Sequence, residues 1–215
     1  MIKFEHTEVV GWTHAIRGMR NPLNSWDKSD SNYCNMKLVD CEKFVDCHID
    51  YCVGDNDLGL MKRLRDAGTD HRKFMRMLTV YVDITAPLYW WKEFDTYKVG
   101  TVANSCSTMH KIHAQRFGIS DFSVDQLHCD IPDCFYDTLE YLNESREKFI
   151  ETKDKKYWWQ MIQLLPTSYN QKRTVMLNYE VLANMYKSRK NHKLDEWHDL
   201  CHWIENLPYS ELITD

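Results

Sequence analysis

The cysteines are the first residues whose types could do chemistry. Cys34, Cys41, Cys47 and Cys52 fall within nineteen residues, together with His48. Zinc ligands usually come as two pairs at C-x2–4-C spacing, whereas the gaps here are six, five and four residues and no second pair follows. The spacing favours structural thiols in a reducing compartment. A zinc-binding interaction module built on Cys34 to Cys52 is the alternative.

His110 and His113 form a second candidate pair, in the segment HKIH. A spacing of three residues is one helical turn, so on a helix the two imidazoles could share a metal. No carboxylate-rich segment accompanies them, and the pattern therefore favours an ordinary surface or core role.

Two tryptophan pairs, Trp90-Trp91 and Trp158-Trp159, could stack on a base or on a flavin ring. Adjacent residues on a helix diverge by about 100°, so at most one of each pair can face a given ligand. Core packing is therefore the favoured use. The basic stretch 187–193 (KSRKNHK) follows a helical pattern, and cations at that end suit the helix dipole.

Composition limits the classes of function. The 215 residues carry 27 basic and 32 acidic side chains, a net charge of −5. This excludes indiscriminate binding to phosphate backbones or anionic membranes. No apolar run is long enough to span a bilayer, and the N-terminus does not resemble a signal peptide. We expect a cytoplasmic protein with neither nucleic-acid nor membrane partners, folded as one domain over residues 1–215.

Hydrophobic periodicity gives the elements that must position any site. Strands are predicted at 2–10, 44–53 and 77–84, the second ending at Gly54, with a polar loop at 20–33. Helices are predicted at 13–19, from Asn56 or Asp57 to Gly68, after Pro87, and at 134–150, 157–165, 178–189 and 194–206. Several long helices with few strands indicate an α+β fold, with one mainly antiparallel sheet.

Two stretches of this pattern together resemble the flavin-dependent thymidylate synthase (ThyX) family. The first is LMKRLRDAGTDHRKF followed by MLTVYVDITAPLYWWKEFDTYKVGTVANSCS. His71 matches the family's flavin-contacting histidine, and Ala86-Pro87 its A-P phrase. Lys92 stands where the family has an arginine ahead of its signature, R-H-R-x-x-S-x-N-E-x-S.

The signature itself is eroded in this chain. Thr96, Tyr97 and Lys98 occupy the R-H-R positions, so one cation of three remains, and Thr101 takes the first serine position. Without a gap, Asn104 and Cys106 match the glutamate and the second serine. With one inserted residue, Asn104 and Ser107 match the asparagine and the serine, which is the preferred alignment because a hydroxyl suits a nucleotide phosphate better than a thiol.

The second stretch, LLPTSYNQKRTVMLNYEVLANMYKSRKNHKLDEWHDL, keeps the spacing of the family. Counted from Pro166, the matching positions are Asn178, Asn184 and Arg189. The family's arginine before L-P is replaced by Ile162 or Gln163, and its A-Q-W-E motif is echoed by Asp195-Glu196-Trp197. In the family the asparagines lie near the flavin and the arginine at the pyrimidine of dUMP.

Helix geometry and side-chain chemistry allow a check on assigning the family's roles to these three residues. Asn178 and Arg189 are eleven residues apart, about three turns, and would share one helix face, with Asn184 displaced by about 120°. Asparagine offers a donor and an acceptor to a flavin edge, and arginine a planar fork for pyrimidine carbonyls that lysine lacks. Solvated residues and a helix cap at Asn178 are the structural alternative.

The resemblance implies a ThyX-like fold assembled as a homotetramer that methylates dUMP or a related pyrimidine nucleotide. FAD would be the cofactor, with NADPH and methylenetetrahydrofolate as co-substrates. Arg189 would be the catalytic residue at the uracil. His71, Asn178, Asn184 and Lys98 would bind the flavin, and Ser107, Asn104 and Lys92 the nucleotide, with no metal. The alternative is a catalytically inactive nucleotide-binding or regulatory protein on the same fold.

Overall fold

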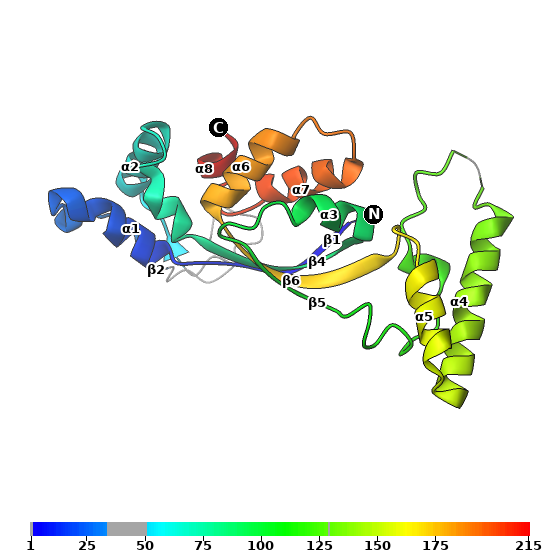
Figure 1. Ribbon diagram of the computed structural model, residues 1–215. Helices are drawn as coiled ribbons and strands as arrows, with labels where there is room; N and C mark the ends of the chain where they lie inside the picture. Colours follow the sequence, from blue (N-terminus) through cyan, green and yellow to red (C-terminus); the bar gives the residue numbers. More distant parts are fainter. Residues whose placement is uncertain (1, 34–50, 129) are drawn as a thin grey trace, which may run out of the picture. The chain divides into compact units, whose positions relative to one another are not determined.

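A computed structural model describes residues 2–33, 51–128 and 130–215 (Figure 1). The described residues form the expected α+β fold, with eight α-helices and an antiparallel sheet. The main sheet has the strand order β1-β4-β6-β5, with bounds Lys3–Val10, Thr79–Pro87, Asn170–Asn178 and Val102–Ser105. A smaller sheet pairs β2 (Asn32–Tyr33) antiparallel with β3 (Tyr51–Cys52).

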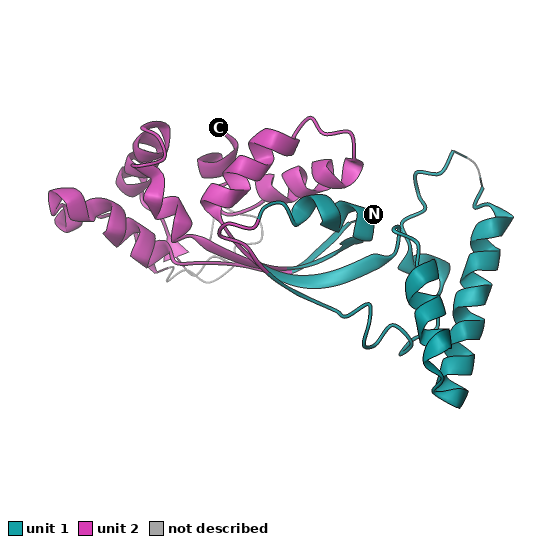
Figure 2. Cartoon of the chain, in the orientation of Figure 1, with its two compact units in different colours: residues 1–5, 83–97, 103–175 teal, residues 6–82, 98–102, 176–215 magenta. Residues whose placement is uncertain are grey.

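The chain divides into two compact units, coloured separately in Figure 2. Unit 1 comprises residues 1–5, 83–97 and 103–175, and unit 2 comprises residues 6–82, 98–102 and 176–215. Each strand of the main sheet runs from one unit into the other. Four of the five crossings between the units therefore lie inside strands, and the fifth lies between Tyr97 and Lys98. The single domain expected over 1–215 stays a prediction.

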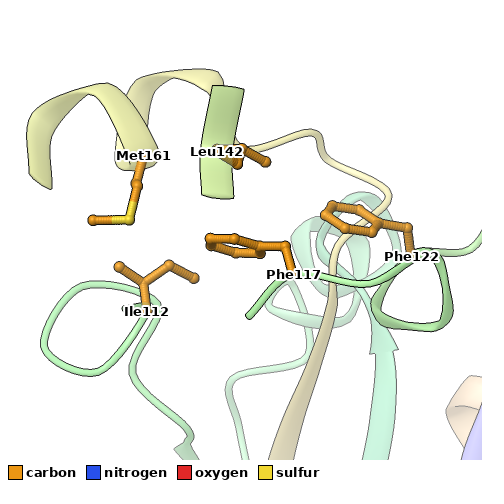
Figure 3. Close-up of a cluster of buried hydrophobic side chains, with 5 residues drawn as sticks. All are labelled: Ile112, Phe117, Phe122, Leu142 and Met161. Carbon is orange, nitrogen blue, oxygen red and sulfur yellow. The ribbon is translucent and has the colours of Figure 1, made fainter. Parts of the chain in front are cut away.

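Unit 1 contains α3 (Leu88–Phe94), α4 (Asp133–Thr152) and α5 (Lys155–Leu164). Lys153 adopts a left-handed conformation after α4, and the Asp154 side chain then caps α5 by accepting a hydrogen bond from the backbone of Lys156 at 3.0 Å. This turn packs the two helices as a hairpin. Their core is drawn in Figure 3 and consists of Ile112, Phe117, Phe122, Leu142 and Met161.

Unit 2 contains most of the remaining helices. In chain order these are α1 (Trp12–Arg20), the 3-10 turns η1 (Asn21–Leu23) and η2 (Trp26–Lys28), α2 (Asp55–Asp66), η4 (Arg72–Arg76), α6 (Tyr179–Arg189), α7 (Asp195–Glu205) and α8 (Glu211–Thr214). Their shared core includes Met61, Leu182, Trp197 and Leu212, all fully buried. Burying each such side chain stabilises the unit by roughly 1.5–3 kcal/mol, which fixes α6 against its neighbours.

Several local expectations are confirmed and others need correction. Pro87 does precede α3, as its N-cap. The loop expected at 20–33 holds η1, η2 and β2, and strands β5 and β6 were not expected. The helical spacing assumed for His110 and His113 is wrong, because residues 108–115 form turns. The strand expected at 44–53 lies outside the described residues except for its end. No helix in the described part of the chain is long and apolar enough to cross a membrane.

Candidate functional site

The candidate site is built around α6, which follows β6 without a loop. Asn178 ends the strand in an extended conformation and caps the helix, because its side-chain oxygen accepts a 3.0 Å hydrogen bond from the backbone of Val181. The Asn178 amide nitrogen makes no hydrogen bond with any described residue. The backbone of Tyr179 donates to Leu78 at 3.1 Å and the Tyr179 hydroxyl donates to Pro208, which anchors the first turn. Asn178 therefore keeps both N–H donors of its amide for a ligand.

The segment from Lys98 to Val102, which matches the eroded signature, lies against this first turn. Gly100 has φ +74°, and a Cβ added there would stand 2.9 Å from the Asn178 amide nitrogen and 3.1 Å from Val181. Only glycine fits this approach, since it accepts positive φ and has no side chain. Lys98 is exposed two residues before Gly100. The two stretches that carry the family resemblance thus meet at the start of α6.

Several basic residues lie near the same end of α6. Arg72 donates to the Glu180 carboxylate at 3.1 Å, and Arg76 makes a second ion pair with it. Burial alone would raise the pKa of Glu180, but the hydrogen bonds from Arg76 and Arg72 outweigh it and hold the pKa below its ordinary value. His71 precedes Arg72 and is exposed. With the helix dipole, these groups favour an anionic ligand near Asn178.

Arg189 lies at the other end of α6, about 16 Å along the axis from Asn178 at 1.5 Å per residue. The Arg189 guanidinium carbon lies 4.4 Å from the ring centroid of Trp197, a fully buried residue of α7. Leu182, two turns before Arg189 on α6, is also buried, so Arg189 lies on the face of α6 that packs against the rest of unit 2. Asn184, in contrast, is exposed. The three residues therefore occupy one helix but not one face.

The remaining predicted site residues belong to unit 1. Lys92 is exposed on α3, and Asn104 is exposed on β5. The Ser107 hydroxyl accepts hydrogen bonds from the backbones of Met109 (3.1 Å) and His110 (2.9 Å) and lies 2.9 Å from the His110 ring nitrogen. Among the described residues of unit 1, no hydrogen bond or ion pair joins Lys92, Asn104 and Ser107 to one another.

One cation in unit 1 was missed by the sequence reasoning. Arg173 on β6 lies with its guanidinium carbon 4.1 Å from the Trp91 ring centroid. It donates to Asp95 at 2.7 Å and to the Gln171 side chain at 3.0 Å. The only sequence signal was weak: Val175 and Leu177 are apolar at every second position. Extending this strand pattern back to residue 171 would have placed Gln171 and Arg173 on one face.

The metal alternatives gain no support from the described residues. No group of three or more potential ligands from histidine, cysteine, aspartate or glutamate occurs in residues 2–33, 51–128 and 130–215. Cys34, Cys41, Cys47 and His48 lie outside the described residues, and the zinc alternative therefore stays untested there. Trp90 and Trp91 both lie in the core, whereas Trp159 is 43% exposed.

Comparison with known proteins gives a likeness of fold. No protein-family model matches the chain, and no curated protein sequence matches it. Two solved structures of flavin-dependent thymidylate synthase ThyX from Helicobacter pylori with FAD and dUMP are similar, at TM-scores of 0.68 and 0.65 and identities of 16% and 15%. The first match covers 100% of this chain and 98% of the other, and the second 99% and 95%.

A third similar structure is the UMP/dUMP methylase PolB from Streptomyces cacaoi bound with 5-Br dUMP. Its TM-score is 0.62 at 12% identity, over 100% of this chain and 94% of the other. At such identities the likeness concerns the path of the backbone and not the site residues. The chain therefore has a ThyX-like fold.

Proposed function

We propose that the protein is a divergent flavin-dependent thymidylate synthase-like enzyme, which methylates dUMP or a related pyrimidine nucleotide. The observation that carries the proposal is the contact between Gly100 and Asn178. This approach brings the segment 98–102, which lies in the eroded signature, next to α6, which carries the matched asparagines and arginine. Both stretches resemble the same family. The likeness of fold over nearly the whole chain supports the proposal.

The residues at the start of α6 fit an anionic, planar cofactor such as FAD. The Asn178 amide nitrogen, the His71 imidazole and the Lys98 ammonium are donors from segments that meet at one helix N-terminus. When bound there, reduced flavin would supply the hydride and the relay of the one-carbon unit from methylenetetrahydrofolate, and NADPH would restore it. The protein's own task is to hold and orient the reactants.

Arg189 would bind the uracil ring and polarise a carbonyl. Stacking on Trp197 uses the flat face of the guanidinium and fixes its plane, while its N–H donors lie at the edge. Fixed donors aimed at developing negative charge stabilise a transition state without reorganisation. Asn184, Lys92, Asn104 and Ser107 would complete the flavin and nucleotide contacts across a homotetramer with shared sites.

A catalytically inactive nucleotide-binding or regulatory protein on the same fold is the second candidate. Thr96 stands at the first arginine position of the signature, and its hydroxyl donates to the Glu93 carbonyl at 2.7 Å. At that position a local hydrogen bond at the end of α3 replaces a cation. This observation favours loss of flavin chemistry on a retained fold.

Flavin content and dUMP affinity distinguish the two candidates. The enzyme proposal expects a yellow protein, or one that takes up added FAD, that binds dUMP and oxidises NADPH when dUMP and methylenetetrahydrofolate are present. Binding of dUMP without flavin uptake contradicts the enzyme proposal and supports an inactive nucleotide-binding protein, whereas binding of neither ligand supports a regulatory protein on the same fold. Sedimentation of the native protein tests the tetramer.

Variants of Arg189 test its assigned role. Arg189→Lys should weaken dUMP binding about tenfold, since it keeps the charge and loses the fork. Lys187→Gln is the matched control, because it removes an exposed cation from the same last turn. Equal losses in the two variants would mean that only the general charge of the helix end matters.

A further inference from the structure

A pocket of about 430 Å³ opens in unit 2, and none of its lining residues belongs to the candidate site. Thr13, Arg17 and Arg20 of α1 form one wall, at the spacing of a single helix stripe. Trp26 and Ser29 from the following loop and Tyr51 from β3 form the rest. This volume lies in the lower part of the usual range for small-molecule sites, roughly 300–1,000 Å³.

The loop that forms the pocket wall is held rigidly by Asp57. The buried Asp57 carboxylate accepts hydrogen bonds from Arg20 at 2.6 Å and from the hydroxyls of Ser29 and Ser31 at 2.6 Å each. The Arg20 guanidinium also donates to the carbonyls of Ser25 (3.2 Å) and Lys28 (3.0 Å). The wall is therefore organised before a ligand arrives, which lowers the cost of binding.

The charge of the pocket favours an anion. Asp57 is neutralised by Arg20, whose side chain is 3% exposed. The three hydrogen bonds of Arg20 leave two of its five N–H groups without a partner among the described residues. Arg17 is exposed and forms neither an ion pair nor a hydrogen bond with any described residue. The lining thus carries one uncompensated positive charge and spare guanidinium donors.

The pocket also presents an aromatic surface. Trp26 is 48% exposed, yet its ring is fixed because the indole N–H donates to the Asn21 side chain at 2.9 Å. An exposed ring held in one orientation is suited to stack on another planar ring. Tyr51 is nearly buried and adds a second aromatic wall.

The geometry points to a second ligand site, one that binds a small planar aromatic molecule carrying a phosphate or carboxylate group. The aromatic part of the ligand stacks on Trp26. Its anionic group accepts hydrogen bonds from the guanidinium of Arg17 and from the two unpartnered N–H groups of Arg20. Nucleoside monophosphates and aromatic carboxylates share this chemistry.

Calorimetric titration of the full chain tests the site and distinguishes a nucleoside monophosphate from an aromatic carboxylate as its ligand. The probes are AMP, p-aminobenzoylglutamate, adenosine and inorganic phosphate. One of the first two should bind once per chain, and adenosine and phosphate at least about tenfold more weakly, because each lacks one half of the recognition. If none of the probes binds at about 1 mM, or if adenosine or phosphate binds as tightly as the better probe, the inference is overturned.

Matched variants locate the binding. Arg17→Gln and Trp26→Leu should each weaken it at least about tenfold, whereas Arg63→Gln, which removes an exposed arginine of α2, should leave it unchanged. Circular dichroism checks that each variant is folded. Binding that survives Arg17→Gln and disappears in Arg189→Gln would place the ligand at the candidate site and overturn the inference, whatever the outcome for the proposed function.

Discussion

Gly100 lies close beside Asn178 at the N-terminus of α6, where a Cβ on Gly100 would come within 2.9 Å of the Asn178 amide nitrogen. The contact joins residues 78 positions apart in the sequence. It places a backbone with positive φ beside an amide whose oxygen already caps the helix. The stability of this corner and the ligand binding proposed for it are therefore linked.

Replacing Gly100 by alanine should destabilise unit 2 and displace Asn178. The positive φ alone costs about 1–2 kcal/mol for a residue with a Cβ, and the close approach to Asn178 and Val181 adds to it. Gly68→Ala is the control, since Gly68 has φ +103° and nothing within 4 Å of an added Cβ. Urea unfolding should show the larger loss for Gly100→Ala. Equal losses would mean that the contact with Asn178 is loose.

Two substitutions separate the capping role of Asn178 from its role as a ligand donor. Asn178→Ala removes both, and should cost about 1 kcal/mol of stability as well as flavin affinity. Asn178→Asp keeps an oxygen for the Val181 backbone, and its charge suits the helix N-terminus. It should therefore unfold like the wild type in urea but bind FAD about tenfold more weakly, since the amide donor is gone. Wild-type FAD affinity in Asn178→Asp would remove Asn178 from the site.

Asp57→Asn should be among the most destabilising single changes in the chain. Arg20 and Asp57 form an ion pair at 2.6 Å with side chains only 3% and 0% exposed. Removing one partner of such a pair leaves a buried charge and costs about 3–5 kcal/mol. Asp66→Asn, in the same helix, is the control because Asp66 pairs with Arg65 while 64% exposed, and its unfolding midpoint should hardly move. A similar midpoint for the two variants would contradict a buried pair.

Stability should decline in acid through Asp57 and Glu180. For Asp57, burial alone would raise the pKa, but hydrogen bonds from Ser29, Ser31 and Arg20 lower it below its ordinary 3.8. Glu180 likewise lies below its ordinary 4.5. The unfolded chain therefore binds more protons than the folded one, so the stabilisation by these groups is full above the ordinary values and is lost as the pH falls below them through the lowered pKa values of the folded chain. Urea unfolding from pH 6 to pH 3 should show this slope, and Glu180→Gln should reduce it.

Much of the fold could be predicted from local sequence. The alternating pattern before Pro87 gave β4, and the helical spacing of 134–150 and 194–206 gave α4 and α7 within one or two residues. β6 was missed because its residues 170–174 (NQKRT) are polar and mask the alternation of Val175 and Leu177, which are both buried. β5 was missed because all four of its residues are exposed, which leaves no hydrophobic signal.

The site was predicted only in part. The spacing from Pro166 correctly put Arg189 at the end of a helix and Asn178 at its start. It gave no indication that Arg189 stacks on Trp197, or that Arg72 and Arg76 pair with Glu180 more than 100 positions away. Whether these residues bind flavin and nucleotide stays a prediction.

The sequence by itself determined most of the helices, strand β4, and which family the chain resembles, because periodicity, caps and motif spacing are local properties. Tertiary structure alone decided that Gly100 meets Asn178, that Asp57 lies buried against Arg20, and that Arg17 and Trp26 line a pocket. Contacts between distant segments depend on how whole elements pack together. A side chain's burial, charge partners and free donors follow from that packing and not from its neighbours in the chain.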